Sequence, residues 1–178
     1  MDERARGKLA GIGLAALLTT PLLGAEVPAS MDETRVPGYR VVTPFLAAAA
    51  QPTLEGLTDV KAAGFKTVVS LRQPEEPGQQ GEEETAQALG LRFVRIPVTP
   101  ASLSLEDVKA VERILDDPAA GPVLLHCHSA NRVGGVWAVI AARKGKSLED
   151  AEAEGRKAGA RSPAIIDAFR RLATEAKP

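Results

Sequence analysis

Residues 122–137 read Pro-Val-Leu-Leu-His-Cys-His-Ser-Ala-Asn-Arg-Val-Gly-Gly-Val-Trp. The continuous apolar run from Val123 to His126 predicts a buried strand that ends at Cys127. A short polar loop follows, Arg132 comes five residues after the cysteine, and an apolar helical pattern runs from about Gly134 to Arg143. The stretch therefore predicts a strand, a polar loop and a helix, with a cysteine where the strand meets the loop.

This arrangement points to anion chemistry. The loop amides and the helix N-terminus direct N–H donors and a positive dipole toward one point. Such a field favours a thiolate over a thiol, so Cys127 is a candidate nucleophile. The planar fork of Arg132 suits two oxygens of a phosphoryl group. The loop that would surround the bound group consists of His128, Ser129, Ala130 and Asn131.

Two simpler explanations of Cys127 are weaker. A buried structural cysteine is common at strand ends, but it does not explain the polar loop, the arginine and the helix start. A metal site of His126, Cys127 and His128 is disfavoured, because neighbouring side chains on an extended segment point to opposite faces. We expect no metal here.

The rest of the chain alternates short apolar runs with helical patterns. Such alternation predicts an α/β fold with a mostly parallel sheet of four to five strands flanked by helices. Ligands bind at the carboxyl ends of the strands in such sheets, which is where Cys127 lies. The predicted strands are 39–43, 67–71, 93–98 and 123–126, and the predicted helices are 54–63, 82–89, 104–115, 134–143 and two more that begin at 147 and 163.

The composition excludes several classes. The chain has 178 residues, a formal net charge of -1 and 3% aromatic residues, a pattern that argues against a nucleic-acid partner. One cysteine and two histidines cannot form an intramolecular disulfide or a four-ligand structural zinc site.

Three segments are expected along the chain. Residues 1–25 have the basic start, apolar run and small residues of a secretory signal peptide, residues 26–38 form a tether, and residues 39–178 form a single catalytic domain. The apolar run is short and broken by Pro21, so stable membrane insertion after cleavage is not expected. The expected destination is the periplasm or the exterior; an uncleaved anchor or an ordinary N-terminal helix stays open.

The segment from His126 to Arg132 resembles the active-site loop of the bacterial beta-lactamase-hydrolase-like phosphatase family, within the protein-tyrosine and dual-specificity phosphatase fold. Residues 39–43, Gln51-Pro52, 64–72 and 93–98 resemble that family in the same order. The resemblance implies hydrolysis of a phosphorylated protein or a small phosphomonoester through a phosphocysteine on Cys127. It also implies phosphate binding by the loop and Arg132, loop ordering by His126, and no cofactor.

The general acid is harder to find. Such phosphatases usually supply an Asp before the cysteine strand, but residues 99–103 contain no carboxylate. Helix capping and dipole matching explain Glu106 and Asp107. His128 could donate the proton instead, and weak acid catalysis predicts better turnover of aryl than of alkyl phosphates.

Two other functions stay open. Four residues separate Cys127 from Arg132, a spacing that rhodanese-type sulfurtransferases share, in which the cysteine carries a persulfide. A catalytically inactive anion-binding module would explain the missing acid, Ala130 in a place where glycine is common, and Val133 where Ser or Thr is usual. Arg72 ends a predicted strand near the same edge, where it either orders the acidic loop after it or binds substrate. The run Glu82-Glu83-Glu84 predicts a solvated first turn of a helix.

Overall fold

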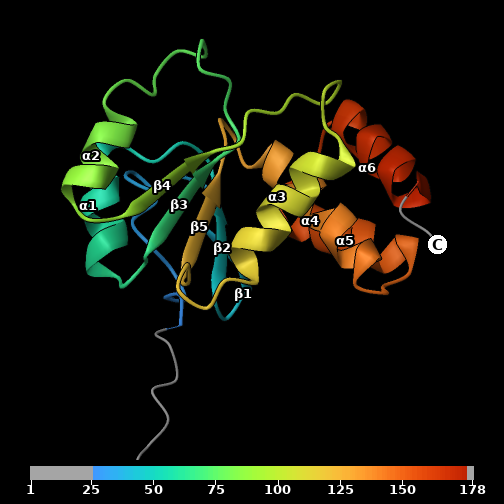
Figure 1. Cartoon of the computed structure of the whole chain (residues 1–178), viewed down its shortest axis with the longest axis horizontal. Helices are drawn as coiled ribbons and strands as arrows, with labels where there is room; N and C mark the ends of the chain where they lie inside the picture. The colour runs from blue at the N-terminus through green and yellow to red at the C-terminus, as the bar shows by residue number, and fades with distance from the viewer. Residues whose placement is uncertain (1–25, 176–178) are drawn as a thin grey trace, which may run out of the picture.

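The computed structural model describes residues 26–175, in which the chain forms a five-stranded sheet with helices on both faces (Figure 1). The strand order is β1-β2-β5-β3-β4, and β1 alone among these strands is antiparallel to its neighbour. The predicted α/β architecture is therefore confirmed, with β5 at the centre. The strands are β1 (Arg40–Thr43), β2 (Leu46–Ala49), β3 (Thr67–Ser70), β4 (Arg92–Arg95) and β5 (Val123–His126).

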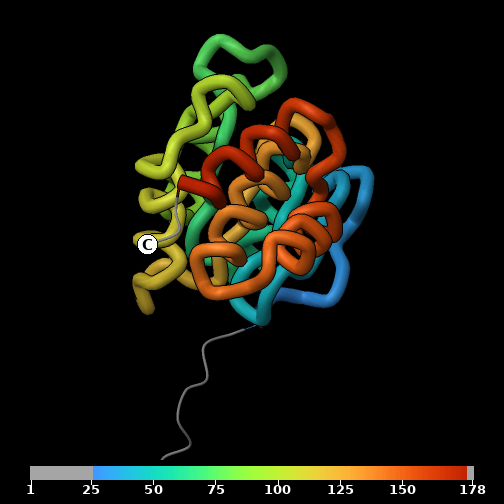
Figure 2. The backbone as a smooth tube through the Cα atoms, turned by 90° about the vertical axis from the view of Figure 1, so that its right-hand side faces the viewer, coloured from blue at the N-terminus to red at the C-terminus, as the bar shows by residue number. Residues whose placement is uncertain are grey.

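Six helices cover the two faces of the sheet within the described part of the chain. Helices α1 and α2 lie on one face, and α3, α4, α5 and α6 lie on the other (Figure 1). In Figure 2, α5 and α6, coloured orange to red, lie in front of the sheet and pack on α4. The helices are α1 (Leu54–Ala62), α2 (Glu82–Ala88), α3 (Leu105–Leu115), α4 (Asn131–Arg143), α5 (Leu148–Ala158) and α6 (Pro163–Glu175).

Local sequence signals explain where several helices begin. The Thr53 side chain accepts a hydrogen bond of 2.9 Å from the Gly56 amide and caps α1. Ser104 and Asp107 form a capping box at the start of α3, so the capping role expected of Asp107 is confirmed. Helix α4 begins at Asn131, three residues before the predicted start, so its first turn follows directly on the cysteine loop.

Alternate residues of the central strands fill two hydrophobic cores. Val68 and Leu124 face the core under α1 and α2, and Val69 and Leu125 face the larger core under α3 to α6. Strand β2, which the sequence pattern does not predict, is fully buried and pairs in parallel with β5. Its Leu-Ala-Ala-Ala sequence has little strand propensity, so tertiary pairing decides its conformation.

Residues 26–38 pack onto the domain, although their composition predicts a tether. Val36 is completely buried and Val27 nearly so, both in the core under α1 and α2. The Ala50 amide donates to the Pro37 carbonyl, and the Thr53 amide donates to the Arg35 carbonyl, both at 2.8 Å. Two buried valines and these hydrogen bonds hold the segment against the sheet.

The N-terminal prediction concerns residues outside the described part of the chain. The expected signal peptide, residues 1–25, lies there entirely. Within residues 26–175, none of the helices has both the length and the apolar character needed to cross a membrane.

Candidate active site

The cysteine loop lies at the carboxyl edge of the sheet, where β5 ends and α4 begins. Cys127 is 1% exposed, in the core beneath the loop. Ala130 turns the chain in the left-handed region, with φ of 63°, so the helix starts at once. Because the first N–H groups of a helix have no acceptor within it, the amides of Asn131 and Arg132 are available to an anion above Cys127.

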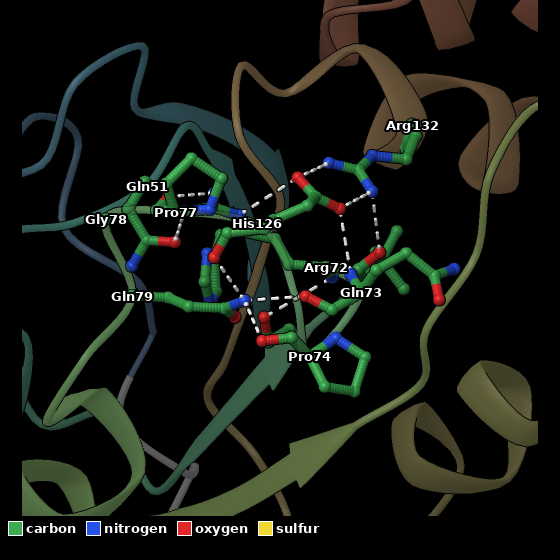
Figure 3. Close-up of polar contacts among 12 residues, drawn as sticks. Gln51, Arg72, Gln73, Pro74, Pro77, Gly78, Gln79, His126 and Arg132 are labelled. Carbon is green, nitrogen blue, oxygen red and sulfur yellow. Dashed lines mark hydrogen bonds and ion pairs between the residues drawn. The ribbon is translucent and has the colours of Figure 1, made fainter.

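The Arg132 guanidinium is fixed by three neighbours. Nη1 donates to the carbonyls of Leu71 and Val98 at 3.2 and 3.0 Å. Nη1 and Nη2 also donate to the two carboxylate oxygens of Glu76, at 2.5 and 2.8 Å (Figure 3). Within residues 26–175, Nε donates to no oxygen acceptor, so the edge formed by Nε and Nη2 is the one that Glu76 leaves for two oxygens of a ligand.

The raised pKa of Arg132 agrees with this arrangement of the guanidinium. Its pKa is raised chiefly by the hydrogen bonds to Glu76, against the effect of burial, and the charge of Cys127 raises it further. The guanidinium is therefore charged at neutral pH and lies close enough to Cys127 for the two side chains to interact electrostatically.

Glu76 is a site residue that the sequence analysis misses. It belongs to the loop after β3, which rises above the carboxyl edge of the sheet (Figure 1). Hydrogen bonds from Arg132 outweigh burial and lower the pKa of Glu76 to about 2. Glu76 is thus a carboxylate at neutral pH and positions Arg132 rather than donating a proton. Its place in an acidic loop four residues after Arg72 is a weak signal.

A cavity of about 410 Å³ opens over the loop. Its ionisable side chains are Glu76, His128 and Arg132, and His128 is exposed at its wall. A larger groove, of about 580 Å³, is lined by α5 and α6 and contains none of the predicted site residues. Of the two, only the smaller cavity is lined by predicted site residues, so it is the candidate site. The residues that line the smaller cavity are Gln73, Glu76, Thr99, Pro100, His128, Ser129, Asn131 and Arg132.

The two carboxylates that follow residues 99–103 are engaged elsewhere. The Asp107 carboxylate accepts from the Ser104 amide at 3.0 Å, as the capping box requires. The Glu106 side chain is 72% exposed and pairs with Arg113 at 3.0 Å. Neither lines the cavity, so His128 remains the candidate acid.

The other loop residues divide between lining and bracing. Ser129 lines the cavity, and its carbonyl accepts from the Arg161 side chain at 2.9 Å. Asn131 uses its side-chain oxygen to accept from the Arg161 and Ser162 amides, at 2.8 and 3.1 Å. The Asn131 side chain therefore braces the loop against the segment before α6, and only the backbone N–H of Asn131 is left for an anion.

Arg72 and His126 lie beneath the site (Figure 3). Arg72 is 1% exposed and donates to Glu76 at 3.2 Å and to the Pro77 carbonyl at 2.5 Å, so it orders the acidic loop. His126 Nε2 lies 3.0 Å from Glu82 Oε1, and both side chains are buried. The prediction of a solvated Glu82 is wrong, because the first residue of α2 faces the sheet.

Comparisons with known proteins match most of the chain to one family. A family described as "Beta-lactamase hydrolase-like protein, phosphatase-like domain" matches residues 38–144. A beta-lactamase hydrolase-like protein of Xylella fastidiosa (strain Temecula1) is 29% identical over 109 residues, which are 59% of this chain and 25% of that protein. The chain thus spans about a quarter of that curated relative's length.

Two solved structures share the fold. P. aeruginosa TpbA has a TM-score of 0.64 and 20% identity, with 89% of this chain and 94% of that chain covered. The catalytic core of the PP-IP phosphatase SIW14 from S. cerevisiae has a TM-score of 0.59 and 19% identity, with 79% and 94% covered. At these identities the likeness concerns the fold alone.

Proposed function

The chain belongs to the family of beta-lactamase hydrolase-like phosphatase domains, and from that premise we propose that it is a cysteine-dependent phosphatase that hydrolyses phosphomonoesters through a phosphocysteine intermediate. The observation that carries the proposal is the free Nε–Nη2 edge of Arg132 in the loop that begins at Cys127. That edge presents two parallel N–H donors to a phosphoryl group, next to a candidate nucleophile.

The first step is attack of the Cys127 thiolate on phosphorus. The S–P bond forms while the bond from phosphorus to the ester oxygen breaks, and that oxygen leaves with the electron pair. Arg132 and the amides at the start of α4 stabilise the charge on the other phosphoryl oxygens. His128 donates a proton to the leaving oxygen when that group is basic enough to need one.

The second step returns the enzyme to its starting state. Water attacks the phosphocysteine and gives a proton to His128 where His128 donated one in the first step. The S–P bond breaks, and its electron pair returns to the Cys127 sulfur. Inorganic phosphate carries the water oxygen away. Glu76 keeps Arg132 oriented through both steps, because it binds the edge of the guanidinium that phosphate does not use.

The test is turnover of 4-nitrophenyl phosphate together with mass analysis of the protein after rapid acid quenching. The wild-type chain should release phosphate and carry a phosphoryl group on Cys127, and Cys127→Ser should do neither while melting at a similar temperature. Cyanide-dependent turnover of thiosulfate without phosphatase activity would instead support the sulfurtransferase, and absence of both activities would support the anion-binding module.

A further inference from the structure

A continuous polar chain joins the two flanks of Cys127 below the loop. It starts at His126, directly before the cysteine, and ends at Arg132, five residues after it. Consecutive members lie 2.5 to 3.2 Å apart. The members, in order, are His126, Glu82, Gln51, Arg72, Glu76 and Arg132.

Gln51 is the neutral link in this chain. Its side-chain oxygen accepts from Arg72 Nη1 at 2.6 Å, and its side-chain nitrogen donates to Glu82 Oε1, also at 2.6 Å. Its backbone amide donates to the His128 carbonyl at 3.4 Å, so it also touches the cysteine loop. Gln51 thus contacts the loop after β3, the start of α2 and the cysteine loop, all of which are far from it in the sequence.

The orientation of the Gln51 amide is determined by its neighbours. A guanidinium can only donate hydrogen bonds and an ionised carboxylate can only accept them. The carbonyl end must therefore face Arg72 and the amide end must face Glu82. Burial alone would raise the pKa of Glu82, but His126 and Gln51 together lower it, so Glu82 is ionised and accepts.

We propose that Gln51 is a positioning residue that sets both flanks of the cysteine loop at once, through Arg72 and Glu76 on the Arg132 side and through Glu82 on the His126 side. The inference deepens the proposed function and rests on it, because the geometry that Gln51 sets is that of the phosphate-binding arginine. Removal of the amide takes one buried hydrogen-bond partner from Arg72 and one from Glu82, while Arg72 keeps Glu76 and Pro77 and Glu82 keeps His126.

The sharpest test is Gln51→Glu, which changes one atom type and nearly conserves the volume. Near neutral pH the new carboxylate can accept from Arg72 but cannot donate to Glu82, and two carboxylates then face each other. Like charges at this distance raise the pKa of one of them, so a proton is taken up on acidification. The protonated side chain can again accept from Arg72 and donate to Glu82.

The interpretation of this titration depends on the charged and titratable groups around Gln51. Glu76 has a pKa of about 2 and stays ionised throughout the range of the test. The charged or titratable groups that face Gln51 and its partners are Arg72 and Glu76 after β3, Glu82 on α2, Arg95 on β4 and His126 on β5.

We expect kcat/KM of Gln51→Glu on 4-nitrophenyl phosphate to be about 10- to 100-fold below wild type at about pH 7.5, and the ratio to recover at about pH 5.5. Gln87→Glu is the matched control, because the Gln87 amide also donates to a glutamate, Glu83, but on the exposed face of α2 at 3.2 Å. Its ratio to wild type should stay near one at each pH.

A second readout does not depend on turnover. Inorganic phosphate should protect Cys127 from alkylation by iodoacetamide. At about pH 7.5, Gln51→Glu should need more phosphate than wild type for half-protection, and at about pH 5.5 this difference should shrink, as for kcat/KM. If wild type protects but does not turn over, the proposed function fails while the role of Gln51 is still measured.

Two results would overturn the inference. One is that phosphate protects Cys127 of Gln51→Glu from alkylation as well as it protects Cys127 of wild type near neutral pH. The other is a loss of kcat/KM or of phosphate protection that acidification does not reduce. Gln51→Met covers the case in which the glutamate variant does not fold, since it removes both hydrogen bonds without adding charge. Phosphate should protect Cys127 of Gln51→Met less well than Cys127 of wild type at both pH values. Equal protection in the two proteins would refute the positioning role of Gln51.

Discussion

Glu76 holds the outer edge of the Arg132 guanidinium with both carboxylate oxygens, at 2.5 and 2.8 Å, although 56 residues separate the two in the chain. The same guanidinium donates to the carbonyls of Leu71, directly after β3, and of Val98, which follows β4. Arg132 is thus held in place before any ligand arrives, which would reduce the conformational entropy lost on binding the proposed phosphoryl group.

Glu76→Gln should lower kcat/KM by about 10-fold or more, because Arg132 then loses its charged partner and part of its orientation. The structural effect should depend on pH. Since folding lowers the Glu76 pKa from 4.5 to about 2, the ionised carboxylate stabilises the fold above pH 4.5 and this contribution is lost as pH falls toward 2.

Melting temperatures across that range check this prediction. The difference in melting temperature between wild type and Glu76→Gln should be constant near neutral pH. It should shrink as the pH falls from 4.5 toward 2, where Glu76 takes up its proton. Glu75→Gln, at the exposed neighbouring position in the loop, is the matched control and should leave both activity and melting unchanged. A difference that did not vary with pH would mean that the ion pair adds nothing to stability.

His128→Ala should reduce turnover of alkyl phosphates more than turnover of aryl phosphates. General acid catalysis typically contributes about 100-fold or more, and a poor leaving group needs it most. Asp107→Asn is the comparison, because Asp107 is occupied by the capping box and should leave the alkyl-to-aryl ratio unchanged. Equal losses on both substrates would make His128 a loop-shaping residue, and a leaving-group-dependent loss in Asp107→Asn would restore a carboxylate acid.

Breakdown of the phosphocysteine should limit the rate. Val133 follows Arg132 and is 1% exposed in the same core as Cys127, so this position offers the departing thiolate no hydroxyl. Stopped-flow mixing with 4-nitrophenyl phosphate should therefore show a burst of about one equivalent of nitrophenol per enzyme. Val133→Thr should shrink the burst, whereas Val136→Thr, buried on the same helix, should not. A linear progress curve for wild type would contradict this prediction.

Gly159→Ala should destabilise the protein by about 2 kcal/mol or more. Gly159 has φ of 125°, and an added Cβ would lie 2.7 Å from the Ala130 Cβ and 2.8 Å from its carbonyl oxygen. Ala130→Gly should stay within about 1 kcal/mol of wild type, because relief of the left-handed alanine offsets the added chain entropy. Denaturant unfolding measures both, and a Gly159→Ala variant as stable as wild type would show that the segment before α6 can move away.

The local sequence determined the core of the site. The apolar strand, the cysteine, the polar loop and the helix are consecutive, so residues 123–143 alone predict where Cys127 and Arg132 lie relative to each other. The capping side chains of Thr53 and Ser104 likewise act within one turn of the chain, so their effect depends on local sequence alone. The alternation of strands and helices was sufficient for the fold class.

Only the tertiary structure decided what holds the site. Glu76, Gln51 and Glu82 come from three different elements of the fold. Their own sequence neighbourhoods give at most a weak signal that they differ from solvated loop or helix residues. Strand β2 and the packed segment 26–38 were missed for the same reason, since their conformations depend on pairing and burial against distant parts of the chain. Local patterns show which groups can react, but the partners that orient a buried charge are chosen by the fold, because only burial makes an unpaired charge costly.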